Sequence, residues 1–395
     1  MKLLRCIRSL DPASGGTVEA VRQSCLGLRE LGHSVEIICL DAQDASWLPY
    51  FPAKVHAVGP ATGTYGYSRR FVPWMRTHAA NYDAVIADGI WQHTCLGTWL
   101  ALRSSKIPYF IVMHGMLDPS FKRYYPLKHV KKQVYWVLAA YWILRGAHAA
   151  LYWTEQERVL ARQSFWPYRF NEAVVGLSIE QPEGDASQQR SLFFREFPGL
   201  RYKRLVLFMG RIHPHKGCDL LIEAFAHISH SDPRLHLVFV GPDDGWQKRL
   251  RKRIVKLGLE DNVTWTGMLT GDMKWGAYNA AEVLVLPSHS ESFGFVVAEA
   301  MACGVPVLIS DKVNIWREVE ATGGGFAAND DLSGTTALLD RWLSLTPNEH
   351  EIIRSKAKEG FAEKFSYPAA LEKLNTVLNT LNGRMDDQTG VSPVD

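Results

Sequence analysis

Short, mostly apolar runs separated by helical stretches constrain the fold of this chain most strongly. In the first half these runs cover residues 3–7, 35–40, 84–87, 109–113 and 149–153. In the second half they cover residues 205–209, 235–240, 263–266, 283–286 and 305–309. Runs of this kind are typical of strands covered on both faces of a parallel sheet, and the alternation predicts βαβ units. We therefore expect an α/β protein whose ligands bind beyond the carboxyl ends of its strands.

The length of 395 residues predicts two domains or slightly more. Composition shifts to polar residues over 176–189, so we expect a first domain over 1–178 and a linker over 179–202. A second domain is predicted over 203–367. Pro368 is expected to break the chain before a last helix within 368–395, which returns to the first domain and ends in a disordered tail from Met385.

Composition limits the function classes. The chain is 47% apolar and 22% charged, with a net charge of +3 that is too small to argue for nucleic acid. Six cysteines without a Cys-x-x-Cys pair indicate buried thiols in a reducing compartment. The first residues, MKLLRCIRSLD, are too short and too charged for a signal peptide, and the apolar run 134–144 is too short to span a bilayer. We expect a cytoplasmic protein.

The pattern of residues 282–310 predicts a strand, a loop, a helix and a second strand, with the helix expected over 293–303. Glu291 precedes this helix and Glu299 follows eight residues later, about 12 Å along a helix axis. The backbone amides of Ser292, Phe293 and Gly294 would lie at the helix N-terminus, which suits a phosphate group. Either the two carboxylates flank a bound sugar diphosphate, or Glu299 is a solvated helix residue and Glu291 only favours the helix dipole.

The second predicted domain opens with strand 205–209 and the sequence Gly210-Arg-Ile-His-Pro-His-Lys-Gly217. Arg211 offers a bidentate fork and Lys216 a point charge, so this turn is well placed to bind a diphosphate. Taken alone, a cation in such a turn is more often an ordinary surface charge. The His-x-His pair in this turn is poor support for a metal site because no third ligand lies near it in the sequence.

Two features of the first half suggest ligand contacts. Gly15 and Gly16 follow the first strand, where paired glycines permit close approach of an anion or form a simple tight turn. His114 follows the strand 109–113 and is followed by glycine. It is suited to donate to a sugar hydroxyl or stabilise developing charge, or it is a histidine hydrogen-bonded within its loop.

The segment 122–145 is both basic and aromatic. Basic side chains beside interfacial aromatic rings suit an anionic membrane surface or a lipid-phosphate acceptor. A buried helix with a solvated basic entry is the alternative. A second basic and aromatic cluster over 65–76 is a possible extension of this surface.

The sequence SESFGFVVAEAMACGVPV, with its Glu-x7-Glu spacing, resembles the donor-site signature of the family 4 (group 1) retaining glycosyltransferases. The resemblance implies the GT-B fold, in which two Rossmann-like domains with parallel sheets face a central cleft. It also implies that Glu291 contacts hydroxyls of the transferred sugar and that Glu299 holds the nucleotide ribose.

Further positions match the same family pattern. The resemblance implies that Arg211 and Lys216 neutralise the leaving diphosphate, and that the loop with Gly15 and Gly16 faces the donor. The HGMLDP sequence resembles a family motif near the sugar's C6 hydroxyl, which implies that His114 polarises the transfer site.

The resemblance places the nucleotide base against the backbone of Met268 and Leu269, and it does not distinguish uracil from guanine. No Asp-x-Asp pair occurs in the chain, so we expect a retaining, metal-independent transferase without a cofactor. Its expected partners are a nucleoside-diphosphate sugar and a cell-envelope glycan or lipid-linked acceptor, with peripheral contact at the inner face of the membrane left open. Two alternatives remain: a nucleotide-sugar epimerase on the same fold, and a non-catalytic sugar-nucleotide-binding partner.

Overall fold

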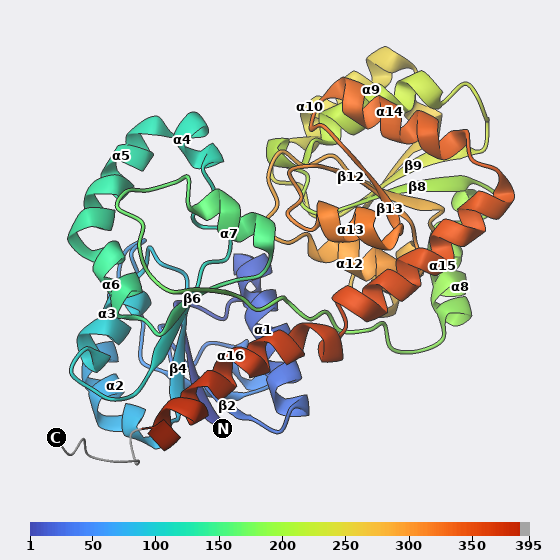
Figure 1. Cartoon of the computed structure of the whole chain (residues 1–395). Coiled ribbons are helices and arrows are strands. Elements are labelled where there is room, and N and C mark those ends of the chain that lie inside the picture. The colour runs from blue at the N-terminus through green and yellow to red at the C-terminus, as the bar shows by residue number, and fades with distance from the viewer. Residues whose placement is uncertain (388–395) are drawn as a thin grey trace. The chain divides into compact units, whose positions relative to one another are not determined.

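The computed structural model describes residues 1–387, which divide into two compact units (Figure 1). The first unit comprises Met1–Ser178 together with the chain from Tyr367 onward, and the second comprises Ile179–Ser366. Each unit has its own parallel sheet with helices on both faces. The GT-B expectation of two α/β domains with parallel sheets is therefore confirmed.

The first unit contains a seven-stranded parallel sheet in the order β3-β2-β1-β4-β5-β6-β7. Its strands are β1 (Lys2–Ile7), β2 (Ser34–Cys39), β3 (Lys54–Ala57), β4 (Ala84–Asp88), β5 (Tyr109–Val112), β6 (Ala149–Tyr152) and β7 (Glu172–Val174). The central strands β4, β5 and β6 are buried along their whole length, which explains their apolar sequences apart from Asp88 at the end of β4.

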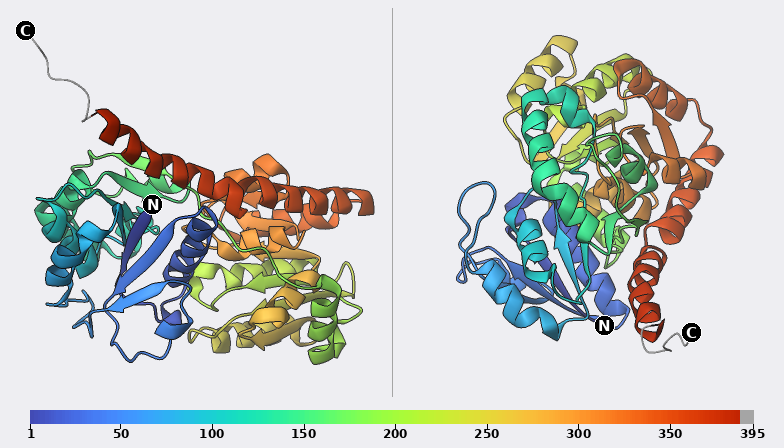
Figure 2. Two further views of the ribbon diagram at one scale, coloured as in Figure 1. Left: turned by 90° about the horizontal axis from the view of Figure 1, so that it is seen from below. Right: turned by 60° about the vertical axis from the view of Figure 1, so that its left-hand side comes forward.

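The helices of the first unit are α1 (Gly16–Glu30), α2 (Phe71–His78), α3 (His93–Leu102), α4 (Ser120–Tyr124), α5 (Pro126–Tyr135), α6 (Tyr141–Gly146), α7 (Glu155–Ala161) and α16 (Tyr367–Asp387). Helix α16 runs beside α1, so the last helix returns to the first unit as expected (Figure 2). A π-helical segment, η4 (Trp136–Ala140), joins α5 to α6.

The second unit contains a six-stranded parallel sheet in the order β10-β9-β8-β11-β12-β13. Its strands are β8 (Arg204–Met209), β9 (Leu235–Val240), β10 (Val263–Gly267), β11 (Val283–Leu286), β12 (Val307–Ser310) and β13 (Gly325–Ala328). Its helices are α8 (Ala186–Glu196), α9 (Cys218–Ile228), α10 (Gln247–Leu257), α11 (Gly271–Ala280), α12 (Phe295–Ala302), α13 (Trp316–Thr322), α14 (Leu332–Leu343) and α15 (Pro347–Lys364).

Several expected boundaries differ from the structure. The segment 179–202 belongs to the second unit and contains α8, which packs against α11, so it is no simple linker. Pro368 lies in the first turn of α16, where proline is tolerated because its missing amide has no helical partner to lose. Residues 385–387 belong to that helix, and the remainder of the expected tail, 388–395, lies outside the described residues.

Short edge strands account for most of the missed elements. The strands β3, β7 and β13 are half-exposed and three or four residues long, so they lack the continuous apolar signal of the central strands. The glycine run 323–325 was expected to be a turn. In the structure Gly323 ends α13 in the left-handed conformation, whereas Gly325 begins β13.

Candidate active site

The loops that follow β8 and β11 form the candidate donor site of the second unit. These two strands are neighbours, and the sheet order reverses between them, which is where ligands bind in open α/β sheets. Gly217 ends the first loop with φ 65°, and a β-carbon there would lie 2.1 Å from the carbonyl oxygen of Pro287. The backbone N–H of His289 also donates to the carbonyl of His215 at 2.8 Å. Glycine is therefore required at 217 for the two loops to pack together.

This packing brings Lys216 and Glu291 into direct contact as an ion pair. Burial lowers the pKa of Lys216 to about 8, and the charge of Arg211 adds to the effect. The carboxylate of Glu291 in contact opposes that shift. Arg211 itself is exposed, with its guanidinium 3.5 Å from the carboxylate of Asp244. The structure brings Lys216 and Glu291 together, while the roles of Arg211, Lys216 and Glu291 stay predictions.

The turn before α12 leaves backbone amides without partners. Gly294 has φ 90° and forms the N-cap, so the helix begins at Phe295 rather than at 293 as expected. In the described part of the chain, the N–H groups of Ser292, Phe293 and Gly294 have no protein acceptor. Three such donors before a helix suit an anion.

Glu299 lies within α12 and is only 9% exposed, so the interpretation as a solvated helix residue is wrong. Lys274 donates to one carboxylate oxygen at 3.0 Å, and the hydroxyl of Tyr278 donates to the other at 2.8 Å. Both donors come from α11 at i, i+4 spacing and therefore share one face of that helix. Burial and the carboxylate raise the pKa of Tyr278 well above its usual value. Glu299 is thus fixed in orientation.

Met268 and Leu269 directly follow β10, after Gly267 with φ 74°. The Met268 side chain is exposed, and the carbonyl of Gly267 accepts from the amide of Gly241 at 2.9 Å. The structure thus places both residues on a loop at the carboxyl end of the sheet, where the resemblance expects the base.

In the first unit, Gly15 lies directly before α1, and Gly16 is the first residue of that helix. Gly15 has φ 72°, is exposed and caps the helix, and a β-carbon there would meet no atom within 4 Å. Glycine is needed for the backbone conformation, and the exposed backbone can be approached closely. The geometry is compatible with both interpretations, a tight turn and a ligand loop.

His114 lies immediately after β5 and is held by a buried carboxylate. Its Nε2 lies 2.8 Å from Oδ1 of Asp88, and Arg5 binds the same carboxylate through Nε at 3.1 Å and Nη2 at 2.5 Å. Burial alone would raise the pKa of Asp88, but Arg5 and His114 lower it below its usual value. His114 also has φ 49°, the only positive φ of a non-glycine residue in the described chain. The loop is therefore held in a conformation that its sequence does not favour.

A second buried carboxylate supports the same loop. Glu157 accepts from the backbone N–H of Gly115 at 2.6 Å and from that of Trp153 at 2.7 Å. Burial raises the pKa of Glu157 to about 7, although these hydrogen bonds favour the charged form. Glu157 thus ties the residue after His114 to the end of β6.

Sequence reasoning missed the residues that orient these side chains. Asp88 carries a recognisable signal, because a carboxylate ends an otherwise apolar strand. Lys274 and Tyr278 carry a weaker sequence signal, since their i, i+4 spacing on α11 does not reveal that their shared partner, Glu299, lies on α12. The partnership of Glu157 with Gly115 spans 42 residues and has no sequence signal.

Within residues 1–387, no group of three or more histidine, cysteine, aspartate or glutamate residues with described side chains is arranged to hold a metal ion. No helix in that range is both long enough and apolar enough to cross a membrane. Burial raises the pKa of the Cys6 and Cys218 thiols beyond their usual value, in keeping with unreactive core residues.

Two family models match the chain. The model for group 1 glycosyl transferases matches residues 193–359, and the model for the glycosyl transferase 4-like domain matches residues 15–175. A D-inositol 3-phosphate glycosyltransferase from Thermomonospora curvata is 42% identical over 214 residues, which is 51% of this chain and 48% of the relative. A mannosylfructose-phosphate synthase from Agrobacterium fabrum is 34% identical over 145 residues, 35% of this chain and 31% of the relative. The chain thus spans less than half the length of these curated relatives.

Solved structures show the same fold. Sucrose-phosphate synthase from Thermosynechococcus elongatus superposes with a TM-score of 0.75 at 20% identity, covering 97% of this chain and 100% of the other. Anabaena Alr3699/HepE in complex with UDP-glucose superposes with a TM-score of 0.75 at 19% identity, covering 97% and 100%. The two family models, the relatives and the two parallel-sheet units agree: this chain belongs to the group 1 (family 4) glycosyltransferases of the GT-B fold.

Proposed function

We propose that this protein is a retaining, metal-independent glycosyltransferase that moves a sugar from a nucleoside-diphosphate sugar to a cell-envelope glycan or lipid-linked acceptor. The contact between Lys216 and Glu291, next to the unpartnered amides before α12, carries this proposal. A cation and amide donors suit a diphosphate, and a carboxylate suits sugar hydroxyls. The absence of an Asp-x-Asp pair from the sequence supports neutralisation of the leaving group by Arg211 and Lys216.

The donor class is supported by two lines of reasoning. Glu299 is held rigidly beyond the amides, where it is suited to accept from ribose hydroxyls. The structural neighbour HepE was solved with UDP-glucose, and the relatives named above are sugar transferases or synthases. We propose that His114, oriented by Asp88, acts beside the transferred sugar, and that no cofactor takes part.

The acceptor proposal rests on an exposed apolar stripe on the segment 122–145. Leu127, Val130, Val134 and Leu138 are 86%, 61%, 56% and 74% exposed, at spacings of three, four and four residues. They therefore share one face of the helix, while Trp136 packs inward. The alternative of a buried helix with a solvated basic entry is wrong for this face.

Cations accompany the stripe, and several lie over aromatic rings. The exposed or half-exposed basic side chains of this segment are Lys122, Arg123, Lys128, Lys131, Lys132 and Arg145. Apolar side chains ringed by cations suit an anionic lipid surface. We propose that the protein acts in the cytoplasm at the inner face of the membrane, where a lipid-linked acceptor is available.

Product analysis tests the transferase proposal. The purified chain would be incubated with a panel of labelled nucleotide sugars and membrane lipid extract, and the products separated. We expect label to move to the lipid or glycan fraction, and Glu291→Gln to abolish that transfer while circular dichroism still reports a folded protein. Conversion of the donor to an isomer without acceptor would instead establish an epimerase. Nucleotide binding without turnover would establish a non-catalytic partner.

Vesicle sedimentation tests the membrane contact separately. We expect binding to vesicles that contain anionic phospholipid, weakened by salt and by Leu138→Glu. Val159→Glu is the matched control, because Val159 is exposed on α7, outside the stripe. Equal sedimentation of both variants and the wild type would contradict the proposed surface.

A further inference from the structure

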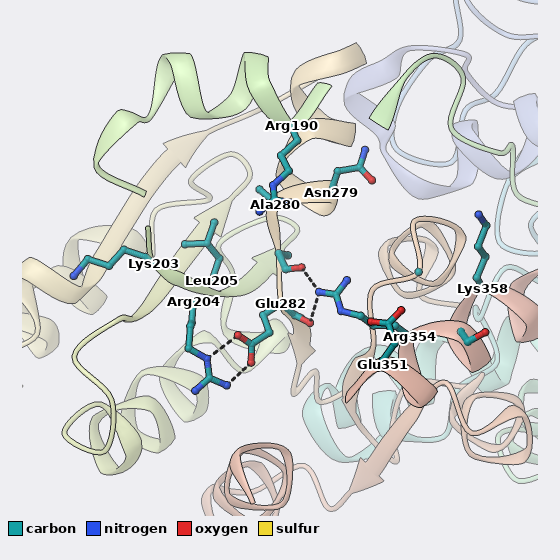
Figure 3. Close-up of a pocket in the computed structure, with 13 residues that line it drawn as sticks. Arg190, Lys203, Arg204, Leu205, Asn279, Ala280, Glu282, Glu351, Arg354 and Lys358 are labelled. Atoms are coloured by element: carbon teal, nitrogen blue, oxygen red, sulfur yellow. Dashed lines mark hydrogen bonds and ion pairs between the residues drawn. The ribbon is translucent and has the colours of Figure 1, made fainter. Parts of the chain in front are cut away.

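A second charged cavity lies in the second unit, away from the candidate donor site. It has a volume of about 590 Å³ and opens where β8 and β11 begin, at residues 203–205 and 279–282 (Figure 3). The loops with Lys216 and Glu291 follow the carboxyl ends of the same strands. Because β8 and β11 are parallel, the cavity lies at their amino ends and the candidate donor site at their carboxyl ends.

Cationic side chains dominate the lining of this cavity. They are Arg190, Lys203, Arg204, Arg354 and Lys358. The lining contains two carboxylates, those of Glu282 and Glu351. The cavity therefore carries excess positive charge, and the contacts of each cation decide which charges remain available to a ligand.

Part of this charge is already neutralised. Arg204 binds Glu282 in a bidentate arrangement, with distances of 2.8 and 2.6 Å, and it also contacts Asp232 at 3.1 Å. The indole N–H of Trp342 donates to the same Glu282 carboxylate at 3.0 Å. Lys203 donates to the carbonyl of Pro233. These groups form a closed network at one side of the cavity.

Arg354 is different, because its half-buried guanidinium has no carboxylate in ion-pair contact among the residues that the structure describes. Its Nη2 donates to the backbone carbonyls of Ala281 at 3.0 Å and Glu282 at 3.4 Å, as Figure 3 shows. Burial lowers the pKa of Arg354, the nearby carboxylates of Glu282 and Glu351 oppose this shift, and repulsion from Arg190 adds a smaller lowering. Among the described residues, neither Arg190 nor Lys358 forms an ion pair. Arg190, Arg354 and Lys358 line the same cavity without a carboxylate in ion-pair contact among the described residues, and a bound anion would supply that contact.

We propose that this cavity binds a phosphate monoester, held between Arg190 of α8 and the pair Arg354 and Lys358 of α15. A guanidinium fork recognises the oxygens of a phosphate through two parallel hydrogen bonds, and an ammonium group adds a point charge. The volume exceeds that of a phosphate ion, so a small organic group attached to the phosphate fits. The ligand is a soluble phosphorylated metabolite.

The position of the two helices suggests what binding would do. Helix α8 follows the passage of the chain into the second unit after Ser178, and α15 precedes its return at Tyr367. A phosphate bound by both helices would tie together the two segments next to these crossings. The site is independent of the sugar transfer proposed above, because it shares no residue with the candidate donor site.

Calorimetric titration of the full chain with inorganic phosphate tests the proposal. The double variant Arg190→Gln, Lys358→Gln should weaken binding by at least about tenfold, because it removes two charge-assisted contacts. Both side chains are exposed, so the melting temperature should not change. Lys364→Gln, a cation on the same helix outside the cavity, should bind phosphate as the wild type does.

The variant Lys216→Met distinguishes phosphate binding at the donor site from phosphate binding in the cavity. Retention of phosphate binding in this variant, with loss in the double variant, would support the cavity. Loss only in Lys216→Met would place the anion at the donor site and overturn the proposal, as would no binding by the wild type at millimolar phosphate. A hexose phosphate should bind at least as tightly as phosphate. Binding to phosphatidate vesicles that depends on Arg190 and Lys358, without binding of soluble phosphate, would overturn the proposal that the ligand is a soluble metabolite.

Discussion

Replacing Asp88 by asparagine should strongly destabilise the first unit. Arg5 and Asp88 are each 1% exposed and joined by two hydrogen bonds, and His114 binds the same carboxylate. The substitution keeps the shape of the side chain but leaves the Arg5 charge buried without a counter-charge. Breaking a buried ion pair in this way costs about 3–5 kcal/mol, and an asparagine oxygen that still accepts from Arg5 would bring the cost toward the lower figure.

Urea unfolding monitored by circular dichroism and tryptophan fluorescence measures this cost. The exposed pair of Arg158 and Glu155 on α7 is the matched control, and Glu155→Gln should change the free energy of unfolding by less than about 1 kcal/mol. If Asp88→Asn also changes it by less than about 1 kcal/mol, the reasoning about the buried pair is refuted. If stability falls as expected while the pH dependence of sugar transfer is unchanged, Asp88 does not orient His114 for the reaction.

Three further predictions follow from the contacts of the two units. Tyr278→Phe removes a hydrogen bond to the buried Glu299 carboxylate and should cost about 1.5–3 kcal/mol in urea unfolding, with weaker nucleotide binding in calorimetry; an unchanged value for both would contradict the assignment. The folded protein holds the proton of Glu157, with a pKa of about 7, more tightly than the unfolded chain, so the free energy of unfolding should lose about 3 kcal/mol as pH rises from about 4.5 to 7. Unfolding curves at both pH values should show this loss in the wild type but not in Glu157→Gln. An equal change in the free energy of unfolding between the two pH values in both proteins would contradict the prediction. Gly217→Ala should weaken nucleotide binding in calorimetry, because its β-carbon would lie 2.1 Å from a backbone carbonyl oxygen. Gly258→Ala is the control, because Gly258 has the same left-handed backbone and a β-carbon there would meet no atom within 4 Å. Equal effects of the two substitutions on nucleotide binding would refute the role of close loop packing.

The sequence predicted the central strands and the candidate donor loops because their signals are local. An unbroken apolar run such as Val283–Leu286 identifies a strand buried on both faces, and the glutamates and cations after such strands predict where a ligand binds. The sequence could not predict that Lys216 and Glu291 are in contact, since this depends on the pairing of β8 with β11. Long-range partners such as Asp88 for His114 are set by sheet order alone.

Edge strands and helix ends were less predictable for a different reason. Half-exposed strands such as β13 have too few apolar residues to show a period, and packing against β12 decides their conformation. The start of α12 was misplaced by two residues because the left-handed conformation of Gly294 is not visible in the sequence. The partners of the buried charges, including Tyr278 for Glu299, became visible only in the folded structure.

The most direct test of the donor site is a thermal-shift screen of nucleoside diphosphates and nucleotide sugars against the wild type, Lys216→Met and Glu299→Gln. A ligand present at 100 times its dissociation constant adds about 2.7 kcal/mol to the free energy of unfolding, which raises the melting temperature measurably. We predict that one base class stabilises the wild type and that both variants lose most of this stabilisation. Stabilisation that is equal in all three proteins, or none with any nucleotide at millimolar concentration, would contradict a donor site built on these residues.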